Sequence, residues 1–407
     1  MQDGAGDPTD GARAAAGDRT VEIRIHASIR EIDEAVWDAL DGVAEAPFLS
    51  WAFLDAMEVT ARVGHGPKPP RRRSAVPESG WIPHHLTFRV AGELVAAAPA
   101  YVKTNSEGEF VFDHGWAGAA ERAGLAYYPK LVVASPFTPA TASRLLVARA
   151  ADRAALLPAL AGALRAICRE AELSSAHVLF PHEAEATGLA DAGMLHRLGL
   201  QFHWHNDGYK TFDDFLARFS SKRRNQIKRE RREMRDRKVD LRTLRGAEIT
   251  PEIIDAMYGF YASTVDKFMW GRHYLSRAFF EEACARLRGK IEIVLARLEG
   301  RPVGAAFNFA GPTALFGRYW GCTEDVPFLH FNVCFYEAID GCIAQGLTRF
   351  EPGAGGRHKL ARGFEPTLTH SAHHVEHPGL RRAVAEFLER EREANRASAE
   401  QKELAWR

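Results

Sequence analysis

Four candidate catalytic side chains lie in a short segment rich in glycine, toward the end of the chain. They are Glu351, His358, Lys359 and Arg362, and three glycines separate the first two. Lysine and arginine can stabilise a phosphate or a developing negative charge, a carboxylate can accept a proton, and histidine titrates near neutral pH. These groups suit acid–base chemistry and the stabilisation of an oxyanion or a phosphate. A surface position for Lys359 and a simple salt bridge for Glu351 are the alternative interpretations.

A second candidate is the strongly basic segment from Ser220 to Lys238. Ten Lys or Arg fall within the seventeen residues that start at Lys222. Ser220 or Ser221 can cap a helix, and no Gly or Pro follows before Gly246, so the segment is predicted to be helical. The helical period predicts an inner apolar stripe of Phe212, Leu216, Phe219, Ile227 and Met234, and a solvent face of Arg224, Lys228, Arg231, Arg232 and Arg235.

This cationic face favours a polyanionic partner, because each cation near a phosphate releases counterions and arginine adds bidentate geometry. The candidate phosphate contacts are Arg223, Arg224, Lys228, Arg231, Arg232 and Arg235. Alternatively the face is merely solvated, with Glu230, Glu233 and Asp236 paired to basic neighbours. The chain holds 53 basic and 53 acidic residues, so the excess is local and suits one phosphate-bearing ligand or one limb of a nucleic acid.

Two further polar groups interrupt apolar segments. Arg318 and Tyr319 lie on a predicted central strand, where an arginine is costly to bury, and a substrate-facing role is favoured over a structural ion pair. The second group, which could line an acceptor cleft between domains, consists of Asp113, His114, Tyr128 and Lys130. Structural pairing of Asp113 with Lys130 is an equally good interpretation.

Composition narrows the class of protein. The 407 residues predict two or three domains, and an apolar fraction of 46% is ample for buried cores. No run of 18 apolar residues occurs and the start of the chain lacks the pattern of a secretory signal, so a cytoplasmic location is expected. The five cysteines show no CxxC pair, which argues against a disulfide framework and a zinc ribbon.

Histidine clusters raise the question of a metal site. They comprise His203 and His205, and His373, His374 and His377. Neither an HExxH pattern nor a matching carboxylate accompanies them, so hydrogen bonding is the favoured role and no metal is expected.

The elements that must position these residues fall into two similar halves. Residues 1–20 are predicted to be disordered, and residues 64–80 to form a flexible loop whose three consecutive arginines are a weaker phosphate candidate. Between them lie a strand and two helices. After the loop come strands within residues 84–104, 108–116 and 129–137, a helix near Glu121, a helix over residues 152–172 and a strand over residues 176–180.

The second half repeats this order without residue-by-residue identity. Two helices, over residues 251–267 and 275–287, follow the basic helix, and strands are predicted over residues 291–300, 303–311 and 313–321. A helix over residues 330–347, a strand over 348–353 and the glycine-rich segment complete it. The predicted fold class is α/β, with domains over residues 21–205 and 206–380 and a C-terminal helix over 381–407.

A meander covered by helices, with one helix between two later strands, is the element order of the GNAT acyltransferase fold. The segment RFEPGAGGRHKLARGFEPTLTHSAHH resembles the strand, glycine loop and Lys-x-x-Arg-Gly-Phe-x-Pro of FemAB-like proteins, which consist of two tandem GNAT domains. Other segments similar to this bacterial family of predicted N-acyltransferases are PFLSWAFLDAME, FVFDHGWAGAAERAGLAYYPKLVVASPFTP, QFHWHNDGY, SKRRNQIKRERR and GRYWGCTEDVPFLHF. The resemblance implies transfer of an acyl group to an amine, with an aminoacyl-tRNA donor and a peptidoglycan-precursor acceptor in the better-known branch.

The donor is left open by the sequence. The Gln/Arg-x-x-Gly-x-Gly/Ala loop that holds the pyrophosphate of coenzyme A is missing after residues 313–321, where Glu324 and Asp325 would repel phosphate. A tightly bound cofactor is therefore not expected, and the acyl donor would be a co-substrate. Two alternatives stay open: an acyl-CoA-dependent N-acetyltransferase that acts on a small amine, and a non-catalytic module that binds RNA or a peptidoglycan precursor.

Overall fold

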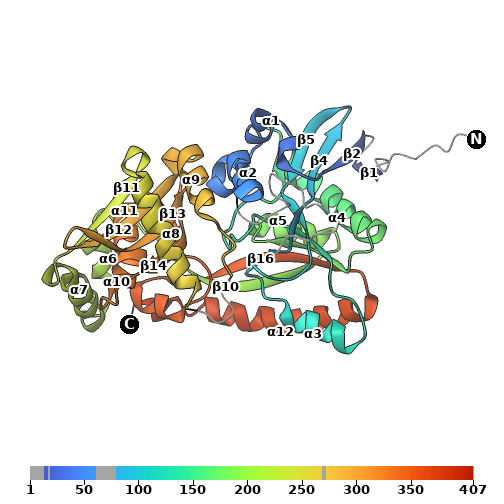
Figure 1. Ribbon diagram of the computed structural model, residues 1–407. Coiled ribbons are helices and arrows are strands. Elements are labelled where there is room, and N and C mark those ends of the chain that lie inside the picture. The colour runs from blue at the N-terminus through green and yellow to red at the C-terminus, as the bar shows by residue number, and fades with distance from the viewer. Residues whose placement is uncertain (1–12, 17–18, 61–78, 268–271, 407) are drawn as a thin grey trace, which may run out of the picture.

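The computed structural model describes residues 13–16, 19–60, 79–267 and 272–406. The predicted α/β class is confirmed, because one antiparallel sheet and one mixed sheet are covered by helices (Figure 1). None of the helices in the described part of the chain is long and apolar enough to cross a lipid bilayer.

A smaller sheet lies in the first half. Its strands, in spatial order, are β1 (Arg13–Ala16), β2 (Arg19–His26), β4 (His85–Val90), β5 (Glu93–Ala98) and β8 (Leu146–Val147). Strand β1 lies within the segment that was predicted to be disordered, and it pairs antiparallel with β2. The predicted flexible loop falls almost entirely outside the described residues.

The larger sheet of eleven strands runs through both halves. In spatial order its strands are β11 (Val239–Arg245), β12 (Ile291–Leu298), β13 (Arg301–Ala310), β14 (Ala314–Cys322), β15 (Arg349–Glu351), β10 (Leu195–His205), β16 (Glu365–Val375), β9 (Ser175–Leu179), β7 (Lys130–Val133), β6 (Ala100–Lys103) and β3 (Trp81–Pro83). Neighbouring strands are antiparallel, except for the parallel pairs β14–β15 and β7–β9.

The two halves exchange strands at the centre of this sheet. Strand β10 ends at His205, next to the predicted domain boundary, yet both of its neighbours, β15 and β16, come from the second half of the chain. Strand β16 in turn pairs with β9 of the first half, from Ser371 opposite Leu179 to Val375 opposite Ser175. Neither half therefore completes its share of the sheet from its own residues.

The helices cover this framework and pack the halves together. They are α1 (Glu34–Asp38), α2 (Trp51–Thr60), α3 (His114–Arg122), α4 (Arg153–Glu170), α5 (Glu183–Asp191), α6 (Phe212–Ala217), α7 (Ser221–Asp236), α8 (Pro251–Val265), α9 (Arg277–Arg286), α10 (Leu329–Phe331), α11 (Glu337–Gln345) and α12 (Pro378–Ala399). A π-helical segment over Asn332–Tyr336 joins α10 to α11. The largest core cluster contains residues of both halves, and Phe48 and Phe53 of the first half contact Phe316 and Phe309 of the second edge to face.

Local signals explain where the basic helix α7 begins. The Ser220 side chain accepts a hydrogen bond from the Arg223 backbone amide, which confirms the predicted N-cap. Ile227 and Met234 are buried as the helical period predicted. The long helix α12 lies along β10 and β16 (Figure 1). It is joined to β10 by Arg197 of that strand, whose guanidinium donates two hydrogen bonds to Glu391 of the helix.

One predicted strand, over residues 108–116, is wrong. The chain is irregular from 108 to 113, and helix α3 begins at His114. The alternating pattern misled the prediction because Glu109 and Asp113 are buried with a charged partner while Phe112 is 66% exposed. Helix α5, which follows β9, had not been predicted.

Candidate active site

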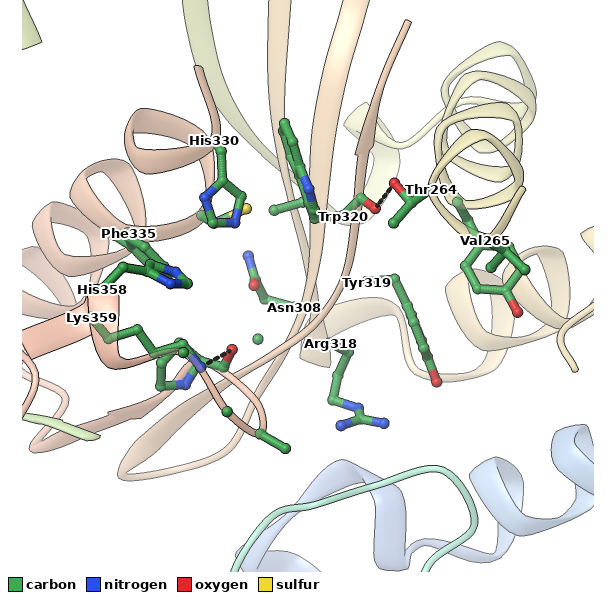
Figure 2. A pocket seen from close by; sticks show the side chains of 18 residues that line it. Thr264, Val265, Asn308, Arg318, Tyr319, Trp320, His330, Phe335, His358 and Lys359 are labelled. Carbon is green, nitrogen blue, oxygen red and sulfur yellow. Dashed lines mark hydrogen bonds between the residues drawn. The ribbon is translucent and has the colours of Figure 1, made fainter. Parts of the chain in front are cut away.

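A pocket opens where two parallel strands separate. Strands β14 and β15 pair only from Ala314 opposite Arg349 to Phe316 opposite Glu351, after which β14 continues while the other strand ends. Within β14 the pairing with β13 shifts, so that Arg318 is the extra residue of a β-bulge between Gly317 and Tyr319. The separation and the bulge leave a pocket of about 350 Å³ (Figure 2).

The pocket is lined by helix α8, strands β13 and β14, the helical segment after β14, the glycine-rich loop, and the 3₁₀ helix η7 (Arg357–Arg362) that follows this loop. The lining residues are Tyr261, Thr264, Val265, Ala306, Asn308, Gly317, Arg318, Tyr319, Trp320, His330, Cys334, Phe335, Pro352, Ala354, Gly355, Gly356, His358 and Lys359. Gly355 and Gly356 have positive φ angles of 72° and 88°, so this loop requires glycine.

Lys359 supplies a buried cation in the pocket wall. Its side chain is part of a residue only 4% exposed, and its Nζ donates to the carbonyl oxygens of Gly353 at 2.7 Å and Pro352 at 3.4 Å. No carboxylate of the described residues pairs with it. Burial lowers the pKa of Lys359 to about 8, so the amine is charged at neutral pH and loses its proton in mildly alkaline solution.

Two histidines line the pocket close to this lysine. The rings of His358 and His330 lie 5.8 Å apart between centroids, and both contact the ring of Phe335. Burial lowers the pKa of His358 below its ordinary value and that of His330 to about 4. Both imidazoles are therefore neutral at pH 7 and able to accept a proton.

Two residues of the sheet that line the pocket carry buried hydrogen-bond donors without a partner among the described residues. Asn308 is only 2% exposed, and among the described residues its side-chain nitrogen has no hydrogen-bond partner. The Arg318 Nε also lacks one there, while its guanidinium lies 5.3 Å from the ring centre of Tyr319 and 6.0 Å from that of Phe110 in the first half. The structure thus places the predicted residues Arg318 and Tyr319 in the pocket wall, and their substrate-facing role stays a prediction.

A comparison with known protein families identifies the family of this chain. The sequence model of the FemAB-like family, described as peptidoglycan biosynthesis/recognition, matches residues 28–406. The chain belongs to the FemAB-like family. No curated protein matches the sequence.

FemX supports this fold at low sequence identity, and other solved structures resemble the chain more loosely. FemX is 12% identical, with a TM-score of 0.50, over 89% of this FemAB-like chain and 100% of its own. A tandem GNAT protein from the clavulanic acid biosynthesis pathway is 14% identical, with a TM-score of 0.39, over 88% of this chain and 99% of its own. The C-terminal domain of a putative lysylphosphatidylglycerol synthetase from Agrobacterium fabrum is 11% identical, with a TM-score of 0.46, over 72% and 85% of the two chains.

Two of the predicted catalytic residues of this FemAB-like chain lie outside the pocket lining. Arg362 points toward helix α7, where its Nη2 lies 3.1 Å from Oε1 of the buried Glu230 and its guanidinium covers the ring of Phe331 at 3.3 Å. Glu351 points toward the first half and accepts a hydrogen bond of 3.1 Å from the Thr141 amide. Both residues hold elements together in this structure, and their part in catalysis stays a prediction.

Asp113 and Lys130, two of the four polar residues predicted to line an acceptor cleft, belong to a buried ion cluster in the first half. Lys130, with no exposed surface, donates to Glu109 at 2.9 Å and also to Asp113, while Tyr127 donates to Asp113 at 2.6 Å. The Tyr128 hydroxyl shares a hydrogen bond of 2.8 Å with Ser106, and exposed His114 starts helix α3. The geometry agrees with the alternative interpretation, in which Asp113 pairs with Lys130.

Helix α7 presents fewer free cations than the periodicity predicted. Arg224 donates to the Phe219 carbonyl at 3.1 Å, and Arg231 donates to Asp340 at 2.9 Å while its guanidinium lies 4.1 Å from the ring of Phe212. Arg223 donates to Gln226 at 2.8 Å. The exposed cations of the helix are Lys222, Lys228, Arg229, Arg232 and Arg235.

Asn308, Trp320 and His330 were missed as pocket residues. Asn308 interrupts the apolar run VGAAFNFAG, which is a signal that sequence reasoning could have used.

Histidines outside the pocket form hydrogen bonds, as between Nδ1 of His177 and Nδ1 of His373 at 2.7 Å. Among the described residues, no group of three or more His, Cys, Asp or Glu is placed to hold a metal ion, and all five cysteines are free thiols.

Proposed function

We propose that this FemAB-like protein is an N-acyltransferase that moves an acyl or aminoacyl group to an amine in the pocket between β14 and the glycine-rich loop. The observation that carries the proposal is the presence of a buried cation and a neutral imidazole, Lys359 and His358, in one pocket wall. Family membership and the fold support a transferase of this kind.

The two residues have separate roles in the proposed reaction. The neutral imidazole of His358 takes a proton from the acceptor ammonium, and the freed amine attacks the carbonyl carbon of the donor ester. A C–N bond forms, the Lys359 ammonium stabilises the negative oxygen of the tetrahedral intermediate, and the C–O bond then breaks. The proton held by His358 goes to the departing alkoxide, the second proton that the attacking nitrogen must lose passes to water, and the reaction needs no further co-reactant.

The exposed cations of helix α7 support a phosphate-rich donor. An aminoacyl-tRNA would supply both the phosphates that this helix attracts and the ester that the proposed reaction needs. Its ester carries the acyl group and its backbone offers the repeated phosphates that a cationic helix face attracts. The acceptor in this proposal is the amine of a small molecule or of a peptidoglycan precursor, and the reaction takes place in the cytoplasm without a tightly bound cofactor.

Reversing three exposed charges on α7 should weaken the use of charged tRNA. For the triple variant Arg229→Glu, Arg232→Glu and Arg235→Glu we expect a KM for aminoacyl-tRNA raised by about 10–100-fold with little change in kcat. The slope of log affinity against log salt should become shallower by about 2, because fewer counterions are released. Filter binding at several salt concentrations and radiolabel transfer measure both quantities.

A matched triple variant controls for net charge. Arg382→Glu, Arg390→Glu and Arg396→Glu makes the same reversal on exposed positions of α12 and should leave the KM unchanged. Equal losses in the two triple variants would contradict a specific role for α7. Turnover of an acyl-CoA that neither triple variant affects would favour the CoA-dependent alternative, and tight tRNA binding without any transfer would favour a non-catalytic RNA-binding module.

The rate of transfer should depend on pH in a way that identifies both groups. We expect the rate to fall above about pH 8, because Lys359 then loses the proton that makes it a cation. The acid limb should lie below the ordinary pKa of histidine, since burial lowers the pKa of His358 and the imidazole must be neutral to act as a base. A profile of kcat/KM against pH measures both limbs.

The variant Lys359→Arg is the control for the alkaline limb. A guanidinium stays protonated throughout the range tested, so any activity that this variant keeps should no longer fall near pH 8. An unchanged alkaline limb in Lys359→Arg would assign that limb to another group.

A further inference from the structure

A buried carboxylate joins the basic helix α7 to the pocket without lining it. Glu230, on α7, is 1% exposed and is not one of the lining residues. Its carboxylate oxygens accept hydrogen bonds from Gln226 at 2.9 Å, from Arg362 at 3.1 Å and from the Tyr336 hydroxyl. Its backbone carbonyl oxygen accepts a further bond of 3.0 Å from the Asn332 side chain. Donors of three segments, α7 itself, the π-helical segment and η7, therefore meet at this residue.

Two of these segments carry side chains of the proposed active site. The π-helical segment over Asn332–Tyr336 provides Phe335, and η7 provides His358 and Lys359. The rings of Phe335 and His358 lie 5.9 Å apart between centroids, so the two segments face each other across one end of the pocket. Glu230 is bonded to both of them, although no residue of α7 lines the pocket.

Arg362 extends this connection to the backbone of the proposed catalytic residues. Its Nη2 donates to Glu230, while its Nη1 donates to the carbonyl oxygen of His358 at 3.1 Å. Its guanidinium also covers the ring of Phe331 at 3.3 Å, which fixes the plane of the group. The carbonyl that accepts from Arg362 belongs to the peptide group between His358 and Lys359. The place of the guanidinium therefore determines where both side chains begin.

We propose that Glu230 is a positioning residue of the transfer reaction. Through Arg362 it fixes the peptide group between His358 and Lys359 against the π-helical segment. This inference rests on the proposed function for the identity of the reaction. The role needs a carboxylate, because an amide at this position would replace one accepting oxygen by a donor that faces the Tyr336 hydroxyl or the Arg362 guanidinium.

The variant Glu230→Gln keeps the volume of the side chain and tests this role on the full chain. We expect kcat for transfer to fall by about 10–100-fold, because a shift of about 1 Å in the reacting groups is enough for such a loss. The KM for aminoacyl-tRNA should change by less than about threefold, since the exposed cations of α7 stay in place. Radiolabel transfer at several donor concentrations separates the two constants.

The pKa of Lys359 gives a readout that a loss of stability alone would not change. Burial lowers this pKa to about 8. A displaced η7 would admit water to the amine, so in Glu230→Gln the pKa should rise toward the ordinary lysine value of about 10.4. The loss of a negative charge could by itself only lower the pKa of a lysine, so a rise identifies displacement. Competitive labelling with acetic anhydride at several pH values, followed by mass spectrometry of the peptide that contains Lys359, measures this pKa without turnover.

Two further variants control for folding, and thermal unfolding shows which variants are folded. Tyr336→Phe keeps every charge and removes only the donor of the π-helical segment, so kcat should fall by about three- to tenfold. It provides the test if Glu230→Gln does not fold. Glu185→Gln changes a buried carboxylate of the first half, which accepts from the amides of Arg144 and Leu145. This control should leave kcat and the pKa of Lys359 unchanged.

The proposal requires both changes in Glu230→Gln. A folded variant in which either kcat or the pKa of Lys359 matches the wild type would overturn it, as would equal losses of kcat in Glu185→Gln. If the wild-type protein transfers no acyl group from aminoacyl-tRNA or acyl-CoA, the proposed function fails. A raised pKa of Lys359 in Glu230→Gln would then still show that Glu230 positions the lysine.

Discussion

Lys359→Met should lower kcat for transfer by about 100- to 1,000-fold, the range seen when an oxyanion-stabilising donor is removed. Methionine nearly matches the volume of lysine but lacks the charge that faces the developing oxyanion. The KM for the donor should change little, because the loss falls on the transition state and not on ground-state binding. Single-turnover transfer of a labelled acyl group measures the chemical step directly.

The stability of this variant distinguishes catalysis from folding. The Lys359 ammonium is buried and forms no ion pair with a carboxylate of the described residues, only bonds to two carbonyl oxygens. Removing it abolishes a desolvation cost as well as those bonds, so the free energy of unfolding should change by no more than about 1 kcal/mol. A kcat within threefold of wild type would show that Lys359 is not the stabilising cation.

Arg362→Met should have its main effect on stability. The Arg362 guanidinium is the ion-pair partner of Glu230, which is 1% exposed and otherwise accepts hydrogen bonds from Tyr336 and Gln226. Removing one member of a buried pair leaves an uncompensated charge, and we expect the free energy of unfolding to fall by about 3–5 kcal/mol. Urea unfolding followed by tryptophan fluorescence measures this loss.

The double variant Arg362→Met, Glu230→Gln is the matched comparison. It removes both charges, so most of the stability should return, and the double-mutant cycle should report a coupling of several kcal/mol. If Arg362→Met unfolds within about 1 kcal/mol of wild type, the pair is not structural. Transfer activity of the folded double variant then decides whether Arg362 also takes part in the reaction, as the sequence predicted.

The elements of the fold were largely predictable because their signals are local. The cap at Ser220 and the apolar period through Ile227 and Met234 defined helix α7 without any tertiary information. The strand predicted over residues 108–116 was wrong, because the alternation of apolar and polar residues in the sequence does not reveal that Glu109 and Asp113 form ion pairs with Lys130. The exchange of β10 and β16 also escaped prediction, since partners far apart in the sequence leave no local pattern.

The same limit applies to the candidate site. The glycine-rich segment pointed to His358 and Lys359, which do line the pocket. It could not separate them from Arg362 and Glu351, because a turn of the 3₁₀ helix and the alternation of β15 send neighbouring side chains to different faces. Charge counting likewise exaggerated the free face of α7, as Arg224 and Arg231 pack against the protein through contacts that no helical period shows.

The exchange of strands has a consequence for how the chain is made. On the ribosome, β9 and β10 emerge long before β16, so the edges that β16 will occupy stay unpaired until residue 375 has left the exit tunnel. Unpaired edges invite association with other chains, and pairings that close such long loops form slowly. The nascent protein is therefore prone to association with other chains until β16 has emerged. Pairing of β16 with β9 and β10 then completes the framework of both halves at once.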